Sequence, residues 1–253
     1  MRPNAPTNPD RPLVLAHRGA SAEAPENTLA AFRLAMEQGA DGLELDVRRC
    51  ASGEPVVIHD ADTLRTSGAA LRVADASLRE LRALDAGAWK SPAFRGERIP
   101  TLDEVLRELP SSVVNVELKS DGVPDAKLAR AVAQVIRDRQ AAARVIVSSF
   151  DPRLLAAFKV AAPEIALGVL FEADGRWRVH ELAGRILDPS AVHPQWRLVD
   201  AVEMERWRSE RLAVNVWTVD APAEVARACE LGVTAIITNV PGATRAAVRR
   251  ATR

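Results

Sequence analysis

The fold is decided by the stretch Gly42-Leu43-Glu44-Leu45-Asp46-Val47. Alternate side chains of a β-strand point to opposite faces, so Glu44 and Asp46 share one face and the three apolar residues share the other. The apolar face suits contact with a layer of helices. The acidic face needs a cation, because unpaired buried charge is costly. The stretch therefore predicts a strand in a helix-covered sheet, with a polar site on its inner side.

The same alternation of β-rich and helical segments extends along the whole chain. The predicted strands cover residues 13–17, 42–47, 113–118, 145–149, 166–170, 191–193, 213–218 and 235–238. The predicted helices cover residues 28–37, 102–109, 126–137, 152–161, 201–210 and 223–230, with a last one from about 243. Asp151 and Asp220, each shortly before a proline, are predicted to cap the helices that follow them. The pattern is typical of a parallel sheet with covering helices, here eight strands in one closed α/β barrel.

Residues 56–59 form a ninth β-rich run that follows the second strand too closely for a parallel crossover, which needs about a dozen residues. We expect a hairpin that turns near Ser52-Gly53 and places His59 opposite Asp46. The irregular stretch that follows, about residues 60–100, interrupts the alternation. It is predicted to be a small insertion with apolar anchors, among them Leu81, Trp89 and Phe94.

Composition limits the functional classes. The chain has 253 residues, a length that α/β barrels commonly use as one domain, so residues 1–253 are predicted to be a single domain. Lys plus Arg equals Asp plus Glu at 34 each, which disfavours nucleic acid or an anionic membrane as partner. No signal-peptide pattern and no apolar run of about 20 residues is present. Cys50 and Cys229 suggest no disulfide framework. We expect a cytoplasmic protein with a small-molecule substrate and no stable membrane insertion.

Three carboxylates are predicted to face the inside of the barrel. Glu117 joins Glu44 and Asp46 from the next barrel strand, and three oxygen ligands suit one divalent cation, Mg²⁺ or Ca²⁺. The alternative is a layer of ion pairs with Arg18 and Lys119. Three acids against two bases leave a deficit of positive charge, which favours the metal.

Two of the four histidines, His17 and His59, end strands that converge on these acids. A pair of imidazoles can serve as base and acid on opposite sides of a phosphorus centre. Arg18 and Lys119 are suited to bind an anion, arginine as a fork and lysine as a point charge. Neither a G-x-S-x-G motif nor a Walker or dinucleotide-binding motif is present. The sequence therefore predicts phosphoryl chemistry.

These motifs, in this order, resemble the glycerophosphodiester phosphodiesterase family. The resemblance rests on residues 15–21, 24–28, 39–47, 56–60, 99–102, 116–119, 148–151, 216–219 and 232–238. It implies a distorted (β/α)8 TIM barrel with a small insertion after the second barrel strand and its hairpin. It also implies metal-dependent hydrolysis of glycerophosphodiesters to glycerol 3-phosphate and an alcohol. By resemblance, the catalytic residues are His17 and His59, the metal ligands Glu44, Asp46 and Glu117, and the substrate-binding residues Arg18, Lys119 and Trp217.

Some choices remain open at this stage. The nucleophile can be water or the neighbouring glycerol hydroxyl, which would give a cyclic phosphate. Departures from the family pattern at Ser52-Gly53, residues 64–67 and Asn239-Val240-Pro241 leave the preference for the alcohol undecided. One alternative is a lysophospholipase D whose apolar channel contains Trp89 and Phe94. Another is a non-catalytic phosphodiester-binding barrel, which should have lost a histidine or a carboxylate, and none is missing.

Overall fold

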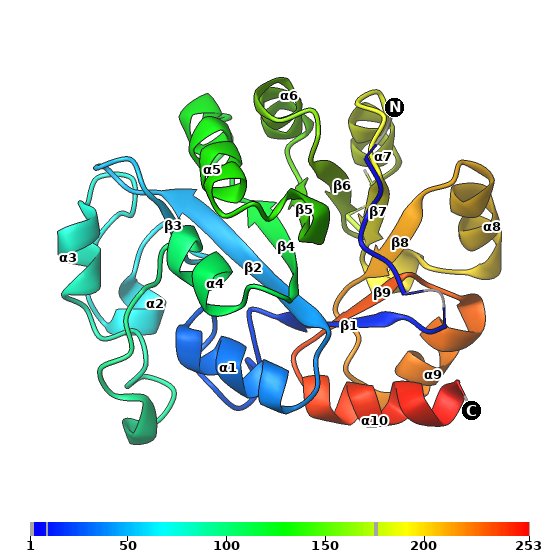
Figure 1. Cartoon of the computed structure of the whole chain (residues 1–253), viewed down its shortest axis with the longest axis horizontal. Helices are drawn as coiled ribbons and strands as arrows, with labels where there is room; N and C mark the ends of the chain where they lie inside the picture. The colour runs from blue at the N-terminus through cyan, green and yellow to red at the C-terminus, as the bar shows by residue number, and fades with distance from the viewer. Residues whose placement is uncertain (1–2, 9, 175–176, 253) are drawn as a thin grey trace.

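The computed structural model of the protein describes residues 3–8, 10–174 and 177–252. Its parallel strands are β1 (Leu13–His17), β2 (Gly42–Arg49), β4 (Val113–Leu118), β5 (Val145–Ser149), β6 (Ala166–Phe171), β7 (Ala191–Pro194), β8 (Ala213–Val216) and β9 (Ala235–Thr238). β1 pairs with both β2 and β9, which closes the strands into a ring (Figure 1). The predicted (β/α)8 barrel is confirmed.

Helices cover the outside of the ring (Figure 1). They are α1 (Leu29–Glu37), α4 (Leu102–Glu108), α5 (Ala126–Asp138), α6 (Pro152–Ala161), α7 (Trp177–Arg185), α8 (Ala201–Ser209), α9 (Pro222–Leu231) and α10 (Pro241–Ala251). Leu43, Leu45 and Val47 are fully buried in the core that these helices share with the strands. Each such side chain contributes about 1.5–3 kcal/mol by leaving water. Within the described ranges, no helix has the length and apolar character that a membrane span requires.

The two predicted helix caps have different outcomes. The Asp151 carboxylate accepts from the backbone N–H of Arg153 at 2.9 Å, so α6 begins as predicted. The prediction for Asp220 is wrong, because Ala221 is the N-cap of α9 and makes no side-chain cap bond. Asp220 instead accepts from the Thr238 hydroxyl and from the backbone and side-chain amides of Asn239. Its carboxylate therefore fixes the end of β9.

The hairpin is confirmed, but its register differs by one residue from the prediction. β3 (Pro55–Val57) runs antiparallel to β2 and lies outside the ring, with Val47 opposite Val57. The backbone N–H of Ile58 donates to the Asp46 carbonyl at 2.9 Å, so Ile58 and not His59 lies opposite Asp46. Strand alternation alone would then turn His59 away from the acids. Because β3 ends at Val57, the chain is free to turn there, and His59 lines the same cavity as Glu44.

The insertion between β3 and α4 contains two short helices, α2 (Leu64–Ser67) and α3 (Leu78–Arg82), and the single turn η1 (Pro92–Phe94). It packs on β3 through a small apolar cluster of its own, which consists of Cys50, Val56, Ile58, Val73, Ala76, Leu81, Ala86 and Ile99. Leu81 is a buried anchor, as expected. Trp89 is 40% exposed and outside this cluster, so it is not the anchor that the sequence suggested.

Candidate active site

A cavity of about 220 Å³ lies inside the barrel at the carboxyl ends of the strands. Its walls come from His17, Arg18, Glu44, His59, Asn115, Glu117, Lys119, Phe150, Leu170, Glu172, Trp217 and Ile237. Seven of the eight side chains predicted from the sequence are in this set. The eighth, Asp46, is 1% exposed and contacts the Arg18 and Lys119 side chains of the wall. The structure thus brings all the predicted site residues together.

Strand register explains how the three acids meet. β2 and β4 pair in parallel with Asp46 opposite Glu117, and Glu44 lies two residues earlier on the same face of β2. Carboxylate oxygens of the three residues lie within 4.8 Å of one another. The Lys119 ammonium is 2.9 Å from Asp46 Oδ1 and 2.5 Å from Glu117 Oε1, and Arg18 Nε is 3.2 Å from Asp46 Oδ2. Asp46 is therefore well paired with cations.

Glu44 is not paired in this way. Its Oε2 accepts from the backbone N–H of Arg18 at 3.2 Å, and the His17 ring nitrogen Nε2 is 3.8 Å away. Burial, reinforced by the charge on Asp46, raises the pKa of Glu44 to about 8. Burial also raises the pKa of Glu117 to about 7 against the influence of Lys119. Burial opposes ionisation of Asp46 too, but Lys119 and Arg18 keep its pKa below the usual range.

These observations fit a bound cation. Three buried carboxylates share one small space, and burial raises the pKa values of two of them, Glu44 and Glu117. The donor set consists of oxygen atoms only, which suits a hard divalent cation. Glu44, Asp46 and Glu117 can hold such an ion together.

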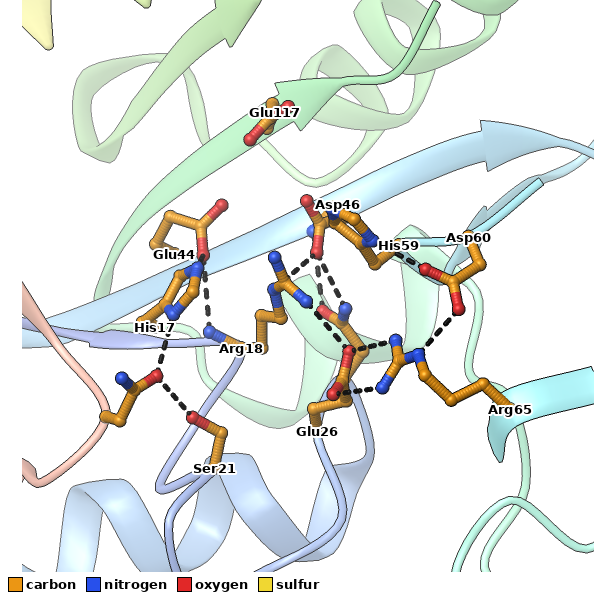
Figure 2. Close-up of polar contacts among 12 residues, drawn as sticks. His17, Arg18, Ser21, Glu26, Glu44, Asp46, His59, Asp60, Arg65 and Glu117 are labelled. Atoms are coloured by element: carbon orange, nitrogen blue, oxygen red, sulfur yellow. Dashed lines mark hydrogen bonds and ion pairs between the residues drawn. The ribbon is translucent and has the colours of Figure 1, made fainter. Parts of the chain in front are cut away.

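The partner of His17 is an amide. His17 Nδ1 lies 2.7 Å from Asn239 Oδ1, which also accepts from the Ser21 hydroxyl (Figure 2). Asn239 Nδ2 donates to Asp220, which orients the amide oxygen toward the ring. An amide oxygen only accepts, so this network assigns the imidazole proton to Nδ1 and leaves the Nε2 lone pair free. Burial lowers the pKa of His17, which favours the neutral ring.

The partner of His59 is a carboxylate. His59 Nδ1 lies 2.7 Å from Asp60 Oδ1, and Asp60 Oδ2 accepts from Arg65 Nε at 2.7 Å (Figure 2). Although burial opposes it, hydrogen bonds from Arg65 and His59 lower the pKa of Asp60 to about 2. Burial lowers the pKa of His59, while the charge on Asp46 acts in the opposite sense. Asp60 is not among the site residues predicted from the sequence, although its position directly after His59 is a usable signal.

A strained turn directs Arg18 into the site. Its φ of 57° is in the left-handed region, and Gly19 follows at 86°. A Cβ on Gly19 would lie 2.6 Å from that of Ala31, so only glycine fits. The Arg18 guanidinium lies between Glu26 at 3.0 Å and Asp46 at 3.2 Å. Such outliers persist where the surroundings hold them, and here they fix a cation at the cavity.

Trp217 forms part of the cavity wall and is held by two contacts. Its indole Nε1 donates to the His193 carbonyl at 2.8 Å, and its ring meets Phe150 edge to face at 5.6 Å between centroids. His193 itself is fully buried, with Nε2 2.9 Å from Asn215 Nδ2. Burial lowers the pKa of His193 to about 3, so its ring is neutral. The backbone carbonyl of His193 thus helps to hold the Trp217 indole in place.

A closed parallel barrel whose polar cavity opens at the carboxyl ends of the strands is the architecture of a TIM-barrel enzyme. Comparison with known proteins gives the family. The model of the Glycerophosphoryl diester phosphodiesterase family matches residues 17–243. The chain belongs to this family, and the prediction of an enzyme of this kind is confirmed.

Individual relatives agree with this assignment. The chain is 38% identical over 231 residues to a glycerophosphodiester phosphodiesterase of Caldanaerobacter subterraneus, covering 90% of this chain and 94% of the relative. It is 34% identical to a putative glycerophosphodiester phosphodiesterase of Bacillus subtilis, over 90% of this chain and 94% of that one. An Oleispira antarctica phosphodiesterase, solved with its product sn-glycerol-3-phosphate, superposes with a TM-score of 0.87 at 29% identity. That alignment covers 94% of this chain and 97% of the other.

Proposed function

We propose that this protein hydrolyses glycerophosphodiesters to glycerol 3-phosphate and an alcohol, with a divalent cation, Mg²⁺ or Ca²⁺, held by Glu44, Asp46 and Glu117. The observation that carries the proposal is the buried carboxylate of Glu44, which faces the cavity and, within the described part of the chain, has only the His17 ring nitrogen, at 3.8 Å, within salt-bridge distance. Membership of the family and the product bound to the Oleispira relative support the substrate class.

The residues around the cavity have complementary tasks in this proposal. Arg18 and Lys119 bind the phosphodiester oxygens, and Trp217 packs against the glycerol or the head group. The bound cation supplies further positive charge to the phosphate. Because Asp46 holds both Arg18 and Lys119, the two side chains keep their positions before substrate arrives. Their preorganisation avoids a reorganisation cost during the reaction.

His17 and His59 serve as base and acid. His17 donates from Nδ1 to a neutral amide and keeps a lone pair on Nε2, which suits removal of a proton from the attacking oxygen. His59 faces the ionised Asp60, which stabilises an imidazolium and suits protonation of the leaving alcohol. The attacking oxygen is water or the adjacent glycerol hydroxyl. Full turnover of a diester that lacks this hydroxyl would exclude the cyclic route.

The decisive assay measures release of glycerol 3-phosphate from glycerophosphocholine and glycerophosphoethanolamine, with and without a chelator. We expect activity that the chelator abolishes and that Mg²⁺ or Ca²⁺ restores, and a Glu44→Gln variant that is nearly inactive at every metal concentration. Chelator-insensitive turnover by the wild-type protein would contradict the metal site. The matched control is Glu230→Gln, a 64% exposed surface carboxylate that pairs with Arg227 at 2.9 Å.

Lysophosphatidylcholine in the same assay tests the lysophospholipase D alternative. Trp89 and Phe94, the aromatics on which that alternative depended, are absent from the cavity wall. We therefore expect turnover of the water-soluble diesters to exceed that of the lysolipid. We also propose that residues 1–253 act as one domain in the cytoplasm, where a reducing environment suits the free thiols of Cys50 and Cys229.

A further inference from the structure

Arg65, from helix α2 of the insertion, lies between two carboxylates at the edge of the site (Figure 2). Its Nη1 and Nη2 donate to the two oxygens of Glu26 at 2.7 and 2.8 Å. Its Nε donates to Asp60 Oδ2 at 2.7 Å. One guanidinium therefore makes three charge-assisted hydrogen bonds, one to Asp60 at the start of the insertion and two to Glu26 in the loop between β1 and α1.

Each of these two carboxylates also accepts a hydrogen bond from a residue that lines the cavity. Asp60 holds His59 Nδ1 at 2.7 Å, and Glu26 holds Arg18 Nη1 at 3.0 Å. The result is a continuous charge chain that runs from His59 through Asp60, Arg65 and Glu26 to Arg18. Without Arg65, His59 with Asp60 and Arg18 with Glu26 would be two separate pairs on two loops.

We propose that Arg65 is a positioning residue that sets the imidazole of His59 relative to the guanidinium of Arg18. This inference rests on the proposed function, because it assigns those two side chains to one reaction. By holding Oδ2 of Asp60, Arg65 directs Oδ1 at His59 Nδ1. By holding both oxygens of Glu26, it fixes the acid that supports Arg18. Arg65 is not among the residues that line the cavity and acts through its neighbours.

The insertion is built to hold Arg65 in place. The Thr66 side chain, next in the sequence, is buried beneath α2, and the Ser67 hydroxyl donates back to the Thr63 carbonyl at 2.8 Å. Gly68 ends the helix in the left-handed conformation, with a φ of 74°. These contacts fix the one-turn helix from which Arg65 reaches the site. The insertion therefore has a direct part in the geometry of the active site.

The fork shape of arginine gives the first test. Lysine keeps the positive charge but is a point donor that cannot bond Asp60 and both oxygens of Glu26 in one plane. We expect Arg65→Lys and Arg65→Met each to lower kcat on glycerophosphocholine by about 10- to 100-fold, the scale at which small misplacements act. The control is Arg72→Met, also in the insertion, whose 70% exposed side chain pairs with Asp75 at 3.6 Å. We expect it to stay within about twofold of wild type.

A double-mutant cycle separates positioning from general stability. Asp60→Asn already weakens the link to His59, so adding Arg65→Met should cost much less in kcat than it does alone. Fully additive losses, or an Arg65→Met protein with a lower Tm but wild-type kcat, would overturn the proposal. Full rescue by Arg65→Lys would also overturn it, because charge alone would then suffice.

A spectroscopic measurement makes the inference independent of turnover. ¹⁵N NMR of the histidine side chains, with His59 assigned through His59→Gln, reports the tautomer of its ring. We expect the Nδ1-protonated form in the wild-type protein and a mixture in Arg65→Met, because a released Asp60 rotates away. An unchanged tautomer in Arg65→Met would overturn the positioning role. If the tautomer differs as expected between the wild-type protein and Arg65→Met, but the wild-type protein hydrolyses no glycerophosphodiester, the proposed function alone is refuted.

Discussion

Gly168 in strand β6 leaves room for the His193 ring, and its replacement by alanine should measure how tightly the barrel interior is packed. A Cβ at this position would lie 2.4 Å from His193 Nε2 and 2.8 Å from His193 Cδ2. Both distances are far below van der Waals contact. His193 is fully buried and bonded to Asn215, so it has little freedom to move.

Overpacking of this kind costs about 1–3 kcal/mol of folding free energy. For a chain of this size, 1 kcal/mol lowers Tm by about 2–4 °C, so we expect Gly168→Ala to lower Tm by roughly 2–12 °C. Differential scanning calorimetry at constant pH and metal concentration measures the change. The control is Gly242→Ala in α10, where a Cβ would meet the Gln38 side chain at 3.4–3.5 Å, an ordinary contact.

The clash has a specific partner, which gives a sharper test. In a His193→Ser background the space beside Gly168 is open, so Gly168→Ala should cost at least about 0.5 kcal/mol less there than in the wild-type protein. Equal costs in the two backgrounds would show that contact with the His193 ring is not the cause, and the packing argument would fail.

Two further predictions concern catalysis and pH. His17→Gln and His59→Gln should each lower kcat by about 10²–10⁴-fold, while Tm stays close to that of the wild-type protein. A loss of activity below about tenfold in either variant would show that this histidine is not one of the proposed catalytic pair. The Asp41 carboxylate accepts hydrogen bonds from Arg11, Arg245 and the Val14 backbone. Burial acts to raise the pKa of Asp41, but these partners lower it below the usual value. The ionised Asp41 carboxylate therefore stabilises the folded protein above its unfolded pKa, and this stabilisation is lost as the pH falls through the lower folded pKa. In urea unfolding, Asp41→Asn should lower the free energy of unfolding by about 1–3 kcal/mol at pH 7, and by progressively less below pH 4. A cost that does not change with pH would contradict this reasoning.

The sequence allowed the barrel and the composition of the cavity to be predicted because both follow from strand alternation. Glu44, Asp46 and Glu117 share a face by their spacing, and parallel pairing of β2 with β4 then brings them together. His17 and Lys119 lie at or just beyond strand ends, which in a parallel barrel meet at one rim. These inferences needed no knowledge of loop conformation.

Features that depend on loops could not be predicted in this way. The register error at His59 arose because the sequence pattern does not fix the exact centre of the hairpin turn, and periodicity does not show where β3 ends. The role of Asp220 was wrong because its spacing from Pro222 suits a cap equally well, and only the fold brings it to Asn239. Arg65 and Glu26 are 39 residues apart, and nothing in their local sequence indicates that they form a bidentate pair. Contacts between distant loops require the packed insertion to be in place.

The pairing of β1 with both β2 and β9 has a consequence for biosynthesis. Until residues 235–238 leave the ribosome, the nascent sheet has two open edges, and β1 with His17 lacks one neighbour along its whole length. Asn239, which orients the His17 ring, emerges only after β9. The reaction centre can therefore assemble only after residues 235–239 have been synthesised, and until then the open β1 edge is exposed to pairing with other strands and benefits from chaperone protection.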